Sequence, residues 1–175
     1  MPTIKNRRGL DIPIHGAAQS SAIQDAPEPT YVALMPTESW GIKVRLDVQV
    51  GDVVSIGTPL FADRRDEAAV FGSPAAGTVV AIHRGQRRKV LSVVIEVHGE
   101  SCIPIQPLNG ADANQDQVRT ALLASGLWPC LRQRPYDRVA LSTNTPRAIV
   151  VQAHDSRPLA AAPQALLAGR KEAFR

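Results

Sequence analysis

A chain of 175 residues with 44% apolar side chains has the length and composition of one or two soluble, folded domains. Its net charge of +4 comes from dispersed basic residues, mostly arginines, which favours a solvated surface and argues against a nucleic-acid partner. Apolar runs such as 148–151 are too short to span a membrane, and Lys5 and Arg8 interrupt any signal-peptide core, so we expect a cytoplasmic protein.

The first part of the chain reads as short strands. Residues 8–16 contain Pro13 and flanking glycines, which predict an extended edge strand rather than a helix. Residues 31–34 and 42–46 predict two further strands, the second with alternating apolar and basic side chains. Trp40 lies in the turn between them, where general grounds favour a place in the core over a part in a ligand surface.

Residues 50–61 and 70–82 predict the two halves of a pseudo-symmetric β sandwich. Each half combines a glycine-containing turn with a β-branched run. The pattern resembles the biotinyl/lipoyl-type fold, the barrel-sandwich hybrid, whose carrier members display a modifiable lysine on the hairpin that joins the halves. Here that hairpin, residues 62–69, carries Arg64 and Arg65 and no lysine, and an arginine cannot be acylated as a lysine can. We therefore expect the fold without the carrier chemistry.

A basic hairpin, residues 83–89, separates the strands 78–82 and 90–97. It could hold an acidic partner or a phosphate, but we favour a charged turn that resists aggregation. Prolines and an Asn-Gly pair then mark a boundary, so that residues 1–108 are predicted to form the β-rich barrel-sandwich hybrid domain.

Residues 109–175 predict the beginning of an α/β domain. A helix with an Asn or Asp cap should start within residues 114–117 and end at Gly126. Residues 146–153 read as a buried strand, and a second helix should begin near residue 166. One strand and one helix cannot complete a parallel sheet, so we interpret this part as a truncated, Rossmann-like domain. The expected fold class is α+β, mostly β.

The chain shows no recognisable reaction centre. Cys102 and Cys130 form no C-x-x-C pair, the four histidines are scattered, and neither a dinucleotide fingerprint nor a Walker loop occurs. We expect no catalytic residue and no metal site. Residues 127–138 combine aromatics, prolines and arginines, which suits either a flat polar ligand or an anchored surface loop.

Several segments together resemble one family, the A subunit of the sodium-translocating NADH:quinone oxidoreductase. They follow the family order over nearly the whole chain, and they are residues 8–16, 82–85, 91–95, 125–128, 131–136 and 148–160. One departure is the segment 35–41, where Pro36 and Trp40 replace the family's turn rich in glycine and glutamate.

The resemblance implies a peripheral subunit on the cytoplasmic side of a bacterial inner-membrane complex that oxidises NADH, reduces ubiquinone and exports sodium ions. Its partners would be the other subunits and ubiquinone, and the flavin and iron–sulfur centres would reside in other subunits. In related flavin-binding proteins a glycine-rich loop lets phosphate approach backbone amides. The loop after Gly126 has no such glycines, so we expect this chain to bind no flavin, NADH or other cofactor.

The family link to quinone suggests where a quinone head could bind. Such a head needs a flat apolar sandwich and hydrogen-bond donors for two carbonyl groups. The residues that could supply these are Trp40, Trp128, Arg132, Arg134 and Tyr136. The alternative is a docking module without a ligand site, which would use the sandwich and the hairpin 84–89 only to contact neighbouring subunits.

Overall fold

The computed structural model describes residues 14–16, 25–108, 113–152 and 159–160. Contacts divide the chain into one compact unit of residues 28–145 and a second that combines residues 1–27 and 146–175. All described helices and strands belong to the first unit. Within the described ranges no helix is long and apolar enough to cross a membrane.

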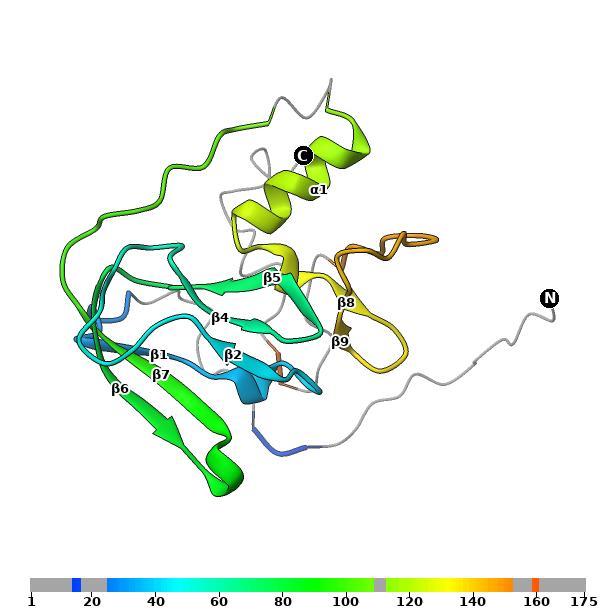
Figure 1. The fold of residues 1–175 in the computed structure, drawn as a ribbon. Coiled ribbons are helices and arrows are strands. Elements are labelled where there is room, and N and C mark those ends of the chain that lie inside the picture. Colours follow the sequence, from blue (N-terminus) through cyan, green and yellow to red (C-terminus); the bar gives the residue numbers. More distant parts are fainter. Residues whose placement is uncertain (1–13, 17–24, 109–112, 153–158, 161–175) are drawn as a thin grey trace. The chain divides into compact units, whose positions relative to one another are not determined.

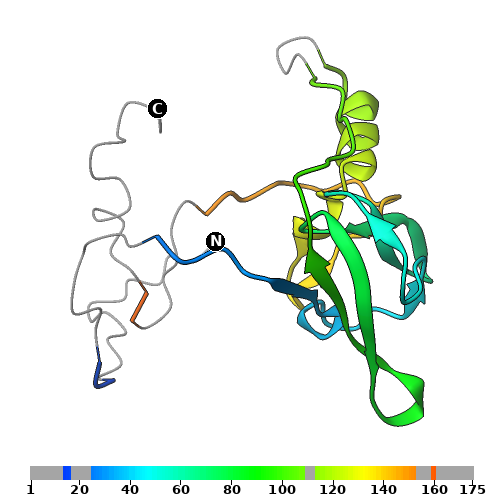
Figure 2. The ribbon, with the colours of Figure 1, turned by 90° about the vertical axis from the view of Figure 1, so that its left-hand side faces the viewer.

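The larger sheet of this unit has four antiparallel strands. Their order is β1 (Tyr31–Leu34), β7 (Val90–Val97), β6 (Gly77–Arg84) and β3 (Val53–Val54). Strands β6 and β7 form a long hairpin that closes on a 3-10 turn, η2 (Gln86–Arg88). Figure 2 shows this green hairpin reaching well beyond the strands beside it.

The second sheet has three antiparallel strands. They are β2 (Val44–Leu46), β4 (Pro59–Asp63) and β5 (Asp66–Gly72), with β2 at one edge (Figure 1). The turn between β4 and β5 is Arg64-Arg65, so the segment predicted as a hairpin over 62–69 is mostly strand with a two-residue tip. A 3-10 turn, η1 (Pro36–Glu38), connects the two sheets before β2.

The core lies between the two sheets. Its largest fully buried side chains are Leu60, Phe61, Val79, Val93 and Ile95, and strand β4 is buried along almost its whole length. The Phe61 and Phe71 rings of β4 and β5 stack with centroids 4.7 Å apart. The β sandwich predicted from the β-branched runs is confirmed.

The segment after residue 113 packs on strand β5. Helix α1 (Gln115–Ala124) confirms the predicted helix with an Asn or Asp cap, and the structure shows that Asn114 forms a capping box with Gln117. Gly126 ends it with a φ of +69° and lies against Gly72 of β5. The turn η3 (Trp128–Cys130) and the two-stranded ribbon of β8 (Arg132–Gln133) and β9 (Arg138–Val139) follow.

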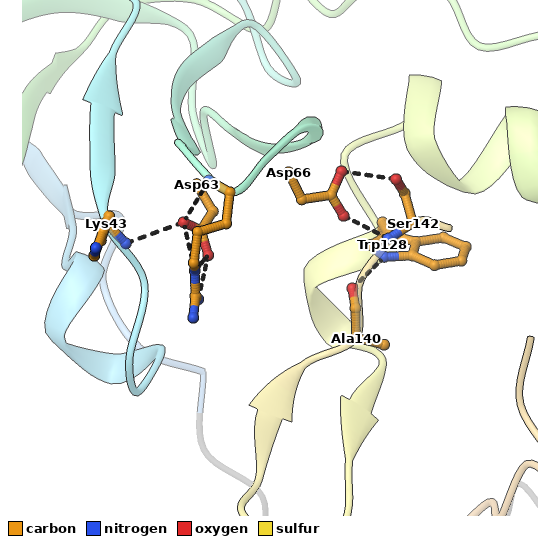
Figure 3. Close-up of polar contacts among 7 residues, drawn as sticks. Lys43, Asp63, Asp66, Trp128, Ala140 and Ser142 are labelled. Atoms are coloured by element: carbon orange, nitrogen blue, oxygen red, sulfur yellow. Dashed lines mark hydrogen bonds and ion pairs between the residues drawn. The ribbon is translucent and has the colours of Figure 1, made fainter. Parts of the chain in front are cut away.

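The compact unit therefore continues past residue 108, where the sequence suggested a domain boundary. Ser142 helps to hold this continuation, because its backbone N–H and its hydroxyl both donate to the carboxylate of Asp66 in β5, the latter at 2.7 Å (Figure 3). The boundary itself remains a prediction.

The buried strand predicted over residues 146–153 is wrong for its described part. Residues 146–152 have no regular structure, and Ile149, Val150 and Val151 are 67%, 90% and 86% exposed. The apolar run suits a strand, but no described strand pairs with it, and a strand needs that ladder to form. Residues 8–13 and the helix expected from residue 166 lie outside the described residues.

A buried carboxylate fixes the start of edge strand β2. Asp63, at the end of β4, accepts the backbone N–H groups of Lys43 and Arg65, each at 3.1 Å, and pairs with the Arg65 guanidinium (Figure 3). Burial alone raises the pKa of Asp63, but the hydrogen bonds from Arg65 and Lys43 outweigh it and hold that pKa below its ordinary value.

We expect Asp63→Asn to destabilise the protein by about 1–3 kcal/mol at pH 7, because the charged acceptor of several donors is lost. A carboxylate with a lowered folded-state pKa stabilises above its unfolded pKa of about 3.9, and this contribution disappears as pH falls through the folded value. Urea unfolding at pH 7 and pH 3 measures both effects. The control Glu67→Gln removes an exposed ion pair to Arg45 and should cost less than about 1 kcal/mol. If the difference in unfolding free energy between wild type and Asp63→Asn does not shrink as the pH falls from 7 to 3, this assignment is contradicted.

Gly77 permits the close pairing of β6 with β7. A Cβ at this position would lie 1.8 Å from the backbone carbonyl oxygen of Glu96, so one strand would have to move. We expect Gly77→Ala to cost about 1–3 kcal/mol through this overlap alone. Gly51→Ala is the comparison, because Gly51 has a φ of +97° and a Cβ there would meet no atom within 4 Å, which leaves only backbone strain. We expect a lower unfolding temperature for Gly77→Ala than for Gly51→Ala. The opposite order would contradict the role given to Gly77.

Candidate functional site

A basic cavity of about 780 Å³ opens beside edge strand β2. Its walls come from the turn around η1, from β2 and the Arg64 turn, and from the far end of the β6–β7 hairpin. No aspartate or glutamate lines it. The seven basic residues in its lining are Lys43, Arg45, Arg64, Arg84, Arg87, Arg88 and Lys89.

Few of these charges are neutralised. Arg45 pairs with Glu67 at 2.8 Å and with Asp47 at 3.1 Å, while its buried Nε has no acceptor among the described residues. The other six basic residues form no ion pair within the part of the chain that the structure describes. Like charges gathered in one recess raise its affinity for anions.

The tip of the hairpin holds two arginines in an unusual backbone conformation. Arg87 and Arg88 have φ values of 54° and 59°, a region that asparagine and glycine adopt with less strain. A backbone hydrogen bond of 2.8 Å from Gly85 to Lys89 closes the turn around them. Such strain costs about 1–3 kcal/mol per residue and is concentrated at functional positions.

Trp40 lies at the wall of the cavity and is 58% exposed, so it is not a core residue. The guanidinium carbon of Arg138 lies 4.5 Å from the centroid of the Trp40 ring and 5.5 Å from that of Tyr136. Tyr136 is also exposed, at 69%. One arginine therefore orders two exposed aromatic rings from segments almost 100 residues apart.

Arg132 and Arg134 are exposed but less closely tied to these rings. In the β8–β9 ribbon, Arg132 is opposite Val139 and Gln133 is opposite Arg138. Cross-strand partners share a face and successive residues alternate, so Arg132 emerges on the face opposite to Arg138. Arg134 lies in the turn of the ribbon.

Trp128 has a structural place. Its side chain is buried, with 6% of the residue exposed, and its indole N–H donates to the carbonyl oxygen of Ala140 at 2.7 Å (Figure 3). Arg119 of α1 lies 5.6 Å from its ring and donates to the carbonyl groups of Ser142 and Asn144. The ring therefore anchors the ribbon and does not line the basic cavity.

Of the five residues selected from the sequence, the structure brings Trp40 and Tyr136 together and separates Trp128 from them. Sequence reasoning missed Arg138, which joins the two rings, because residues 127–138 looked like one loop and not a ribbon. The basic hairpin was noticed, but its meeting with Lys43 and Arg64 depends on the pairing of distant strands. Among the described residues no cluster of three or more metal-ligating side chains occurs.

Comparison with known proteins agrees with this architecture. Residues 4–98 match the family model of the NqrA N-terminal barrel-sandwich hybrid domain, and residues 113–175 match that of the NqrA second alpha/beta domain.

Curated relatives match along almost all of the chain. The A subunit of the Na(+)-translocating NADH-quinone reductase of Yersinia pseudotuberculosis is 44% identical over 98% of this chain, and the proteins of the same name from Cellvibrio japonicus and Pseudomonas aeruginosa are 42% identical over the same share. The chain spans 39% of the length of these relatives. It therefore belongs to the NqrA family, with a barrel-sandwich hybrid domain followed by residues of the second alpha/beta domain.

Proposed function

We propose that this chain is part of the A subunit of a sodium-translocating NADH:quinone reductase and contributes a contact to the quinone head. The subunit would lie at the cytoplasmic side of the membrane, where it would work with the other subunits of the complex. The names of the relatives support the membership. The quinone contact rests on the geometry around Trp40.

The observation that carries this proposal is the Trp40–Arg138–Tyr136 cluster. It offers two exposed aromatic rings held by one guanidinium, and one of these rings, Trp40, lines a cavity rich in hydrogen-bond donors. A quinone head is flat and stacks on such rings, and its carbonyl oxygens accept hydrogen bonds from arginine or lysine. Arg138 thereby joins the residues selected from the sequence, and Arg132 and Arg134 remain candidate donors.

Trp128 takes a different role in this proposal. Its ring is buried and its N–H is already bonded, so it would position the β8–β9 ribbon and would not touch quinone. A substitution of Trp128 would disturb quinone binding only indirectly, through the fold. It is therefore a poor probe of the contact.

We also propose that this chain holds no flavin, NADH or metal of its own, and that the redox cofactors reside in other subunits. The loop after Gly126 supports this. It continues as Leu127, Trp128 and Pro129 in a tight 3-10 turn, whose side chains leave no glycine-lined cradle for a phosphate.

Photo-crosslinking of a ubiquinone analogue to the intact complex tests the quinone contact. We expect labelled peptides from residues 34–42 or 127–138. In the same complex, Trp40→Leu, Tyr136→Leu or Arg138→Gln should weaken quinone binding about two- to tenfold, the value of one aromatic contact. Tyr31→Leu is the matched control, because Tyr31 is a 55% exposed aromatic of β1 outside the cavity lining.

Label confined to other subunits, together with an unchanged KM for quinone in all three variants, would overturn the quinone contact. The chain would then be a docking module of the complex.

A further inference from the structure

The outer edge of strand β2 lies at the basic cavity, and no described strand pairs with it. Strand β2 pairs only with β4 among the described strands. The carbonyl of Lys43 accepts from Arg64 N–H at 2.8 Å, and Asp47 N–H donates to Leu60 at 3.0 Å, so both residues direct their backbone groups toward β4. In an antiparallel ladder the residues between alternate, so Val44 and Leu46 direct theirs away from β4. Both residues line the cavity.

We propose that this edge binds an acidic, extended peptide segment of another protein, which adds a strand to β2 while its carboxylates pair with the arginines of the β6–β7 hairpin. Backbone groups two residues apart match the repeat of a strand, and main-chain hydrogen bonds of this kind provide affinity without a deep side-chain pocket. This inference does not depend on the quinone contact.

The charges select the kind of partner. Arg84, Arg87 and Arg88 lie on one wall, Lys43 and Arg64 come from the side of β2, and no acidic residue intervenes. A second copy of this chain would bring the same lysine and arginines to the edge, and like charges oppose such pairing. An acidic segment would be attracted to the edge instead, because its carboxylates could pair with cations that form no ion pair among the described residues.

The strained tip supports the same assignment. Arg87 and Arg88 occupy a turn that glycine or asparagine would form more easily, and their backbone conformation keeps both arginines at the cavity. A turn that served only to prevent aggregation could carry its charge without this strain.

Fluorescence anisotropy with the full chain tests the proposal. The probe is a labelled decapeptide of alternating Glu and Val, and the comparison probe is the same peptide with every backbone nitrogen methylated. The second has the same charge but no backbone N–H group to donate to a ladder. We expect the Glu-Val probe to bind at least about tenfold more tightly, and its affinity to fall as salt is added.

Two sets of variants test the contribution of the β2 edge and that of the hairpin charges independently. Val44→Pro removes an outward N–H and the valine side chain, whereas Val44→Ala removes only the side chain, which packs against the core. We expect Val44→Pro to bind the Glu-Val probe about three- to tenfold more weakly than Val44→Ala, the value of about one hydrogen bond. Arg84→Glu with Arg88→Glu, both on the exposed hairpin, should abolish binding without changing the unfolding transition.

Three results would overturn the proposal. Equal affinity for the two probes would show attraction by charge without strand addition. Equal binding by Val44→Pro and Val44→Ala, with both variants folded by circular dichroism, would show that the edge is unused. If pyrophosphate displaces the probe at constant ionic strength, adjusted with sodium chloride, the cavity is a site for a small anion.

Discussion

The turn between β4 and β5 determines how the rest of this unit is arranged. Asp63 and Asp66 face each other across it, and each carboxylate accepts hydrogen bonds from a different part of the chain. Asp63 holds the start of β2 through Lys43, and Asp66 holds the segment after β9 through Ser142. Buried or partly buried carboxylates are costly unless several donors surround them, so both segments must be in place for the hairpin to be stable.

This arrangement explains how a carrier-type fold can serve another purpose. The hairpin that presents a lysine in biotinyl and lipoyl carriers here ends in Arg64-Arg65. Arg65 folds back onto Asp63, and Arg64 lines the basic cavity. The tip thus acts within this compact unit, where it stabilises an edge strand and adds charge beside it.

The basic cavity and the aromatic cluster share Trp40 but use different chemistry. The cluster offers aromatic rings, whereas the hairpin and the edge of β2 that no described strand covers offer positive charge and backbone groups. Under the proposed function the chain would need attachment to other subunits as well as any ligand contact. Different residues could meet these two needs, because Arg138 and Tyr136 belong to the ribbon and Arg84 and Arg88 to the hairpin.

The sequence by itself determined the local structure. The strands at 31–34, 53–54 and 90–97 and the capped helix after Asn114 depend on side-chain alternation, β-branched residues and a capping box, all of which act between near neighbours. Only the tertiary structure decided which of the two tryptophans is buried, because burial depends on what packs against each ring. It likewise decided that Arg138 joins Trp40 to Tyr136, and that residues 146–152 form no strand, since an apolar run becomes a strand only where another strand can pair with it.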